Sequence, residues 1–137
     1  MSMLQSVFGW FDQRYNIVPL IEKNVTAEVL AEHSVWPHDP QFALALAGGI
    51  TALQILPGSA NLIGGRGVTL KNVPAGDVYA MKFPGAPYGL KMACGENPKR
   101  VYGEKGRTPA TRMGNVAGYR SAWIRAASSR GLNGFDR

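Results

Sequence analysis

The sequence predicts a single domain of α/β type, and three segments support this prediction. A short apolar helix over residues 40–47 is followed by two glycines and then by an apolar strand. Residues 89–94 form a second compact apolar run of strand length. After this run comes a long segment with apolar residues at three- and four-residue spacing, which is typical of an amphipathic helix. Helices and strands that alternate in this order indicate an α/β protein.

Two helix starts are predicted in the first third of the chain, after a crowded aromatic stretch over residues 1–15 that has no clear period. Residues 25–33 are expected to form a short helix with Asn24 as the N-cap. The second start is stronger, because Asp39 can accept the free amide hydrogens of a first turn and Pro40 suits position N1. This helix is expected to end at Gly48-Gly49, with a positive φ at the C′ position.

The middle of the chain is predicted to contain one buried strand and one hairpin. Residues 50–56 form an apolar run with little alternation, which favours a strand buried on both faces, as in parallel sheets. Pro57-Gly58 ends this strand, and residues 59–67 are expected to form a loop whose small residues allow close backbone approach. Residues 68–72 and 77–83 are then predicted to be two strands of a hairpin-like excursion.

In the last third, residues 89–94 are predicted to be a strand that closes on a turn over residues 95–98. Thr108-Pro109 is expected to cap a long helix that faces a sheet. The face that would pack against the sheet consists of Met113, Val116, Ala117, Tyr119, Arg120, Trp123, Ile124 and Ala127. Residues 129–137 have no pattern and are expected to be a frayed tail of the single domain 1–137.

Composition and charge restrict the possible classes of partner. The 137 residues are 45% hydrophobic and 18% charged, which is ordinary for one soluble domain. Residues 1–65 carry two basic and five acidic residues, whereas residues 66–137 carry thirteen basic and four acidic ones. Such asymmetry can mark a nucleic-acid surface. The basic residues are scattered without interleaved aromatics, however, so a solvated surface or a face that meets another part of the same protein is the favoured interpretation.

No apolar run is long enough to span a bilayer, and the start of the chain does not have the pattern of a secretion signal, so a cytoplasmic location is expected. Cys94, as a single cysteine, excludes an internal disulfide and a cysteine metal cluster. It is expected to be a small buried apolar residue, with a reactive thiol as the alternative.

Five stretches, taken together and in order, resemble the imidazolonepropionase-like branch of the amidohydrolase superfamily. They are DPQF (39–42), AGGIT (47–51), LPGSANLIGG (56–65), GLKMACGENPKRVYG (89–103) and TRMG (111–114). Each stretch alone is a weak signal, but their common order and spacing are specific. The resemblance extends over about residues 18–126, which is most of this chain and about a third of such an enzyme.

The resemblance implies part of a (β/α)8 (TIM) barrel of the metal-dependent hydrolase type, with a short β excursion. In the complete family enzyme, one or two divalent metals, most often zinc, activate a water that attacks an amide, peptide or cyclic amide carbonyl. The family ligands are a His-x-His pair, a carboxylated lysine or acidic residue, two further histidines and a final aspartate. His33 and His38 do not match the His-x-His spacing. That pair is expected before Met1 and the later ligands after Arg137, so the chain is interpreted as an internal fragment that is inactive alone.

Two residues are candidates for the one remaining metal ligand. Lys91 lies in an apolar strand, where a charged amine is costly unless it is paired, neutralised or carbamylated to bridge metals. Glu96 follows the same strand and could bind a metal directly. The alternatives are a strand-edge lysine that reaches solvent and a turn or capping carboxylate. For His33 and His38, a surface role or a role at the entry to a helix is favoured over metal binding.

The loop after the first buried strand is the candidate substrate side of the site. Ser59 and Asn61 could form hydrogen bonds with a substrate, and Gly64-Gly65 could present backbone donors to a carboxylate. The alternative is a loop that needs small residues only to turn tightly. The sequence contains neither a Ser-His-Asp arrangement nor the pattern of a phosphate-binding loop.

Three functions therefore remain open. The first is a fragment of a metal-dependent amidohydrolase that acts on C–N bonds of a small amide or peptide-like substrate. The second is a non-catalytic binding or assembly module, because a partial barrel exposes sheet edges that favour self-association or pairing with another barrel fragment. The third, and least favoured, is a basic nucleic-acid-binding protein.

Overall fold

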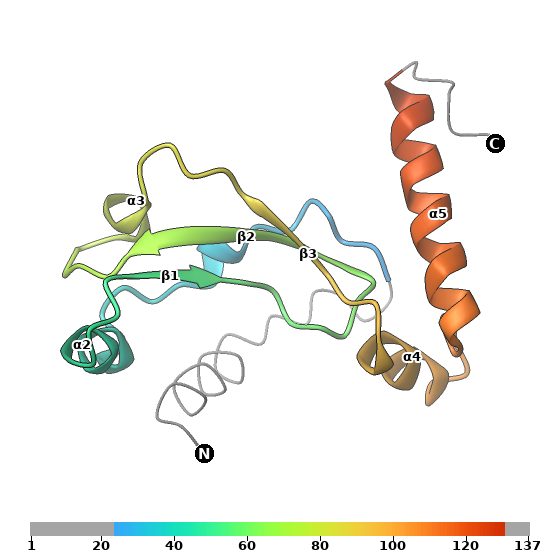
Figure 1. Ribbon diagram of the computed structural model, residues 1–137, viewed down its shortest axis with the longest axis horizontal. Coiled ribbons are helices and arrows are strands. Elements are labelled where there is room, and N and C mark those ends of the chain that lie inside the picture. Colours follow the sequence, from blue (N-terminus) through green and yellow to red (C-terminus); the bar gives the residue numbers. More distant parts are fainter. Residues whose placement is uncertain (1–23, 131–137) are drawn as a thin grey trace.

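The computed structural model describes residues 24–130, which form a small open sheet with helices around it (Figure 1). The aromatic stretch 1–15 and residues 131–137 of the predicted tail lie outside the described residues. In order along the chain, the elements are η1 (Ala31–Ser34), α2 (Pro40–Ala47), β1 (Ala52–Ile55), β2 (Ile63–Lys71), α3 (Val78–Met81), β3 (Gly89–Met92), α4 (Glu96–Gly103) and α5 (Arg112–Ser129).

The sheet is antiparallel, with strand order β1-β2-β3, so the predicted parallel strand is wrong. Consecutive strands are joined by loops or a short excursion, and no helix carries the chain back across the sheet as a parallel connection requires. In β1, Ala52 and Gln54 are exposed whereas Ile55 is buried, which is the alternation of a strand with one open face. The described residues accordingly form an α/β structure with an open three-stranded sheet and no barrel.

The expected helix over residues 25–33 is also wrong. Val25 and Leu30 instead form isolated parallel bridges with Ile63 and Arg66 of β2, and only the single turn η1 follows. The side chain of Asn24 does not cap a helix but donates a hydrogen bond to the carbonyl oxygen of Thr108, at 3.4 Å. Pairing with a distant strand therefore overrides the local helix signal in this segment.

The segment between β2 and β3 does not contain the strand predicted over residues 77–83. Strand β2 begins at Ile63, within the predicted loop 59–67. Residues 77–83 contain the short helix α3, because the Asp77 carboxylate accepts a hydrogen bond from the Ala80 amide at 2.9 Å and thereby caps it. Lys82 then bridges to Leu70 in antiparallel fashion, so the segment does return alongside β2. The predicted turn 95–98 is the start of α4.

The predicted helix over residues 40–47 is confirmed in both its start and its end. The Asp39 carboxylate accepts a hydrogen bond from the Gln41 amide at 3.0 Å, and Pro40 occupies the first helical position. Gly49 has a φ of 85°, which a residue with a side chain rarely adopts. A polar residue at the N-cap and glycines after the last turn were therefore reliable local signals.

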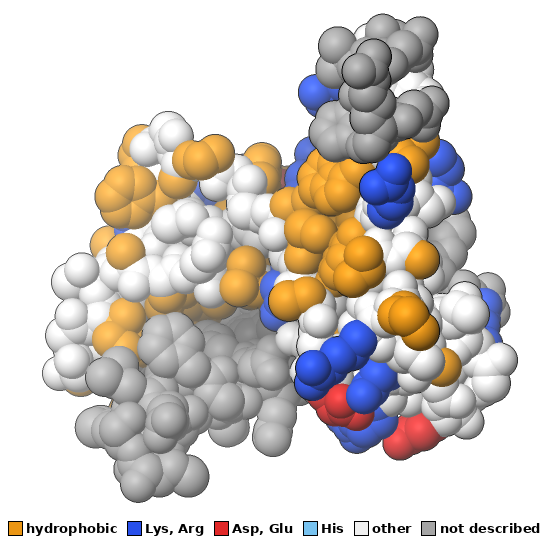
Figure 2. Space-filling view, turned by 45° about the vertical axis from the view of Figure 1, so that its right-hand side comes forward, with side chains coloured by type: hydrophobic (Ala, Val, Ile, Leu, Met, Phe, Trp, Pro, Cys, Tyr) orange, Lys and Arg blue, Asp and Glu red, His pale blue; other side chains and the backbone are white. Residues whose placement is uncertain are grey.

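Helix α5 begins three residues later than predicted and presents the large side chains Met113, Val116 and Trp123 of its apolar face to solvent. Its N-cap is Thr111, whose hydroxyl accepts a hydrogen bond from the Gly114 amide at 3.0 Å. Met113 and Val116 are 81% and 65% exposed, whereas Tyr119 and Ile124 are half-buried and Ala127 is buried, so the predicted face packs inward only in part. Asn115 is buried as well, and Gly118 lies so close to Leu62 that a side chain there would collide with it. Figure 2 shows hydrophobic side chains gathered over this helix, with basic ones around them.

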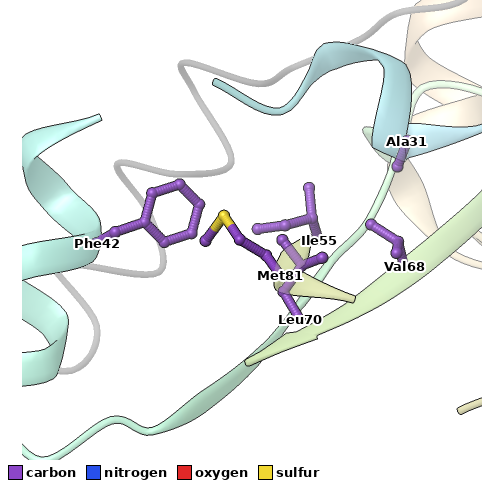
Figure 3. Close-up of a cluster of buried hydrophobic side chains, with 6 residues drawn as sticks. All are labelled: Ala31, Phe42, Ile55, Val68, Leu70 and Met81. Atoms are coloured by element: carbon purple, nitrogen blue, oxygen red, sulfur yellow. The ribbon is translucent and has the colours of Figure 1, made fainter. Parts of the chain in front are cut away.

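The apolar core lies where η1, α2, β1, β2 and α3 meet, on one face of the sheet (Figure 3). Its buried members are Ala31, Phe42, Ile55, Val68, Leu70 and Met81. Asn72 supports the edge of this core, because its side-chain amide donates to the carbonyl oxygens of Phe42 and Ile50 at 2.9 and 2.8 Å. Among the described residues, no helix combines the length and apolarity needed to cross a membrane.

We predict that Leu70→Ala lowers the free energy of unfolding by about 2–5 kcal/mol, because Leu70 is fully buried and its removal leaves a cavity in the core. Leu44→Ala is the matched control, since Leu44 is 57% exposed on α2 and should change the free energy by under about 0.5 kcal/mol. Urea unfolding followed by circular dichroism measures both. Equal effects of the two substitutions would contradict the assignment of the core.

Candidate functional site

The loop after β1 is held rigidly by buried residues on both sides of Ser59. Pro57 and Gly58 are buried before it, and Asn61 is buried after it. The Asn61 side chain donates to the hydroxyl of Thr26 at 2.9 Å and accepts from the hydroxyl of Tyr102 at 2.8 Å. Burial raises the pKa of Tyr102, which keeps its phenol protonated as a donor. Ser59 thus sits on a fixed turn of backbone.

Strand β2 contains an irregularity beside this loop. Ile63 pairs with Met92 and Gly65 pairs with Lys91, so the register between β2 and β3 shifts at Gly64. A Cβ atom at Gly64 would lie 3.0 Å from the carbonyl oxygen of Gly58 and 3.7 Å from Cγ of Lys91. Gly65 has a φ of 125° and passes close to the backbone of residue 29. Both glycines lie in β2 rather than in a tightly turning loop, and both allow a close approach of the neighbouring backbone.

The irregularity brings Lys91 next to Ser59. The Lys91 ammonium donates a hydrogen bond to the Ser59 hydroxyl at 2.9 Å, and both side chains are half-buried. They line an open depression of about 380 Å³, which residues 92–98 complete. Three residues that the sequence singled out, Ser59, Lys91 and Glu96, therefore share one concavity, which we call the Ser59–Lys91 depression. Asn61 does not line it, because its side chain belongs to the buried network.

Cys94, which also lines the depression, differs from its expected setting. Cys94 is exposed, so the prediction of a buried apolar cysteine is wrong. The next residue along the chain, Gly95, is held by α5, because the buried Asn115 amide donates a hydrogen bond to its carbonyl oxygen at 3.0 Å. Two α5 side chains contact the depression in this way, because the Tyr119 hydroxyl also donates a hydrogen bond, to the carbonyl oxygen of Ala93.

Glu96 is the first residue of α4 and is exposed to solvent. Its carboxylate forms an ion pair with Lys99 three residues later, at 2.8 Å. The hydrogen bond from Lys99 lowers the pKa of Glu96 below its ordinary value. Glu96 is therefore ionised at neutral pH and already has a cationic partner.

The described residues do not fit a complete metal site. No three of their histidine, cysteine, aspartate and glutamate side chains group closely enough to hold an ion. The Lys91 amine is engaged with Ser59, and the Glu96 carboxylate with Lys99. His33 is exposed, as is His38, which lies at a larger and mainly apolar hollow of about 730 Å³ beside α2. That hollow contains no cluster of reactive groups, so the smaller Ser59–Lys91 depression is the candidate site.

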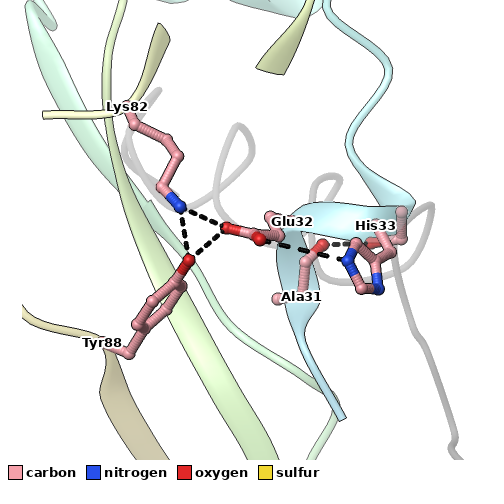
Figure 4. Close-up of polar contacts among 6 residues, drawn as sticks. Ala31, Glu32, His33, Lys82 and Tyr88 are labelled. Atoms are coloured by element: carbon pink, nitrogen blue, oxygen red, sulfur yellow. Dashed lines mark hydrogen bonds and ion pairs between the residues drawn. The ribbon is translucent and has the colours of Figure 1, made fainter. Parts of the chain in front are cut away.

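The sequence did not indicate a charged cluster around Glu32 (Figure 4). The Glu32 carboxylate, only 5% exposed, accepts hydrogen bonds from the Lys82 ammonium at 2.7 Å and from the Tyr88 hydroxyl at 2.6 Å. The Lys82 ammonium also lies 4.6 and 5.6 Å from the ring centres of Tyr88 and Tyr79. The three hydrogen-bonded side chains come from η1, the end of α3 and the loop before β3, so no local pattern could have joined them.

The protonation states in this cluster follow from its contacts. Burial alone would raise the pKa of Glu32, but the hydrogen bonds from Lys82 and Tyr88 outweigh it, and the pKa lies below its ordinary value. The hydrogen bond to Glu32 raises the pKa of Lys82. Both groups are charged at neutral pH, and the cluster ties three segments together.

Comparison with known proteins gives two partial matches. No protein-family model matches the chain. Amidohydrolase tasK of Hapsidospora irregularis is 38% identical in an alignment of 114 residues that covers 76% of this chain and 12% of that protein. The crystal structure of an amidohydrolase from Thermotoga maritima MSB8 superposes with a TM-score of 0.77 and 41% identity, over 83% of this chain and 29% of that one. The chain thus spans less than a third of either relative.

We predict that Lys82→Met destabilises the fold at pH 7, because it leaves the buried Glu32 carboxylate without its cation. In the unaltered chain the pKa of Glu32 is lowered. The ionised Glu32 carboxylate, paired with Lys82, therefore stabilises the fold above the ordinary pKa of 4.5, and this stabilisation is lost as the pH falls through the folded-state pKa. The destabilisation by Lys82→Met should therefore be smaller at pH 4, which lies below the ordinary value of 4.5, than at pH 7.

Urea unfolding at both pH values measures this effect. Lys99→Met, which removes the partner of the exposed Glu96, is the matched control and should change stability little at either pH. A loss that is equally large at pH 7 and at pH 4 would show that Lys82 acts through packing alone.

Proposed function

Because the chain corresponds to a segment of an amidohydrolase, we propose that its Ser59–Lys91 depression forms one wall of an active site that hydrolyses C–N bonds. The observation that carries the proposal is the 41% identity to an amidohydrolase of known structure over 83% of this chain. The depression is the concavity at which loop, strand and helix termini from that matched segment converge.

The proposed substrate class is a small amide, peptide or cyclic amide, and the proposed parent architecture is a (β/α)8 barrel. In the complete enzyme a divalent metal, zinc in the first place, would supply an activated water. The described residues do not fit that metal, so the remaining parts of the enzyme would have to hold it. The part played by this chain is to shape and position: Asn61 and Gly64 fix the loop, and Ser59 and Lys91 present polar groups to the substrate.

A non-catalytic assembly module is the second candidate, and the outward face of α5 favours it. This helix exposes three large apolar side chains, Met113, Val116 and Trp123, and exposed apolar groups gathered on one element are unusual. Such a module would form a stable oligomer, by self-association or with another barrel fragment, without binding zinc.

We predict that the 137-residue chain alone shows no zinc-dependent hydrolysis of amides, because its described residues do not group into a metal site. Release of amine from N-acylated amino acids, with added zinc and with EDTA, measures this. Turnover that zinc raises and EDTA abolishes would contradict the expectation.

We also predict that a chimera of the Thermotoga maritima amidohydrolase, with its matching segment replaced by residues 24–130 of this chain, keeps its hydrolytic activity. Within that chimera, Ser59→Ala combined with Lys91→Met should lower kcat/KM by about tenfold or more, because two polar contacts to the substrate are lost. Lys105→Met is the matched control, since Lys105 is exposed and lies outside the depression. A folded chimera that tolerates the double substitution as well as the control would refute the proposal.

A further inference from the structure

The outward side of α5 carries large apolar side chains at a regular spacing. Met113, Val116, Arg120 and Trp123 follow one another at steps of three, four and three residues, which places them on one side of the helix. All four are exposed, and hydrophobic side chains gather over this helix at the surface (Figure 2). We call these four residues the α5 stripe. They extend along about 15 Å of the helix, with one guanidinium among three apolar groups.

The contacts on the other side of α5 keep this stripe turned outward. The side chains of Asn115 and Tyr119 donate hydrogen bonds to backbone carbonyl oxygens of residues 93–95. Gly118 lies close to Leu62, which leaves no room for a side chain at this position. Rotation of the helix about its axis would break these contacts, so the stripe stays at the surface of the described structure.

The spacing of the stripe suits another helix as its partner. Apolar residues at alternating steps of three and four form the seam along which two helices pack, with the side chains of one helix between those of the other. The partner element is therefore a helix of similar length with apolar residues at the same spacing.

Arg120 determines the chemistry of that partner helix. It lies between Val116 and Trp123 in the stripe, so a helix that covers those two residues also covers the guanidinium. A buried guanidinium is costly unless a carboxylate meets it, and the two groups then form a pair of parallel hydrogen bonds. From this we infer that the α5 stripe binds a helix of a partner protein that carries one aspartate or glutamate opposite Arg120. The inference rests on the second candidate function, that of an assembly module, and names the chemistry of its partner.

A second copy of this chain does not meet that requirement. Helix α5 contains Arg112, Arg120 and Arg125 and no acidic residue. If two stripes packed against each other, in either direction, the two Arg120 guanidiniums would lie within about one helical turn of one another, and neither helix would supply a carboxylate. Like charges brought together in an apolar contact disfavour self-association.

A membrane surface is disfavoured by the same residue. A helix that lies on a bilayer keeps its basic residues on the polar side and turns its apolar side toward the lipid. In α5, Arg120 interrupts the apolar side. A protein helix with a matching carboxylate is the occupant that suits all four residues of the stripe.

Calorimetric titration of the 137-residue chain with synthetic helical peptides tests the inference. Each peptide has about 21 residues, that is three heptads, with leucine at the apolar positions of the seam. The central apolar position is replaced by glutamate in the first peptide, by glutamine in the second and by lysine in the third. The chain should bind the glutamate peptide with a Kd on the order of 10 μM, the glutamine peptide about tenfold more weakly, and the lysine peptide not at all.

Reversal of the charge on the stripe provides the matched variants. Arg120→Glu should abolish binding of the glutamate peptide and confer binding of the lysine peptide, because the ion pair is restored in the opposite sense. Arg125→Glu makes the same change at an exposed position on the other side of α5 and should change the Kd by less than about twofold. Trp123→Ala should weaken binding by about tenfold or more, since a large apolar contact is lost. Circular dichroism of each variant checks that its helix content is unchanged.

Absent binding of the glutamate peptide, equal affinity for the three peptides, or unchanged affinity after Arg120→Glu would overturn the inference. So would a dimer of the chain that sedimentation detects and Val116→Asp dissociates, because a second copy would then occupy the stripe. Binding to phosphatidylglycerol vesicles that Trp123→Ala abolishes would overturn it in favour of a membrane. An oligomer that survives Val116→Asp, together with absent peptide binding, would refute this inference and leave the assembly function standing.

Discussion

The close backbone packing around the first half of β2 is the constraint on which the rest of the structure depends. At Gly65 a Cβ atom would lie 2.7 Å from the carbonyl oxygen of Val29, and at Gly67 it would lie 2.9 Å from that of Ile55. The strand is therefore flanked closely by residues 25–30 and by the end of β1. Side chains at these positions would separate the three segments, and with them the bridges that bring η1 to the core.

Each half of β2 serves a different purpose. Its second half carries Val68 and Leu70 into the apolar core, where burial stabilises the fold. Its first half carries few large side chains and instead holds the loop after β1 and the strand β3 at short distance. The same strand thus contributes both to the core and to the backbone that borders the depression.

Local signals predicted the elements that are determined locally. Asp39, Pro40 and Gly49 defined α2 correctly because capping and positive φ depend on neighbouring residues alone. The apolar run 89–94 likewise gave a strand at the expected place. The resemblance placed Ser59, Lys91 and Glu96 among the site residues, and the structure brings these three to one depression.

Features set by distant contacts could not be read from the sequence in the same way. The segment 25–30 has a helical pattern but pairs with β2, and Glu32 finds Lys82 and Tyr88 at separations of 50 and 56 residues. The apolar period of α5 correctly indicated a helix, but it could not reveal which face packs inward. Asn115 and Gly118 decide that orientation, through one buried amide and one close approach.

The register shift at Gly64 connects a local feature of the backbone to the position of a side chain in the depression. A slip of one residue moves the side chains of a strand to the opposite face of a sheet. If the pairing of Ile63 with Met92 continued without the shift, Gly65 would pair with Leu90 instead of Lys91, so the shift determines which side chain of β3 lies beside Gly65. Bulges are frequent beside functional sites because they redirect a side chain in this manner. The glycine that permits the shift is as necessary to the depression as the two side chains that give it its chemistry.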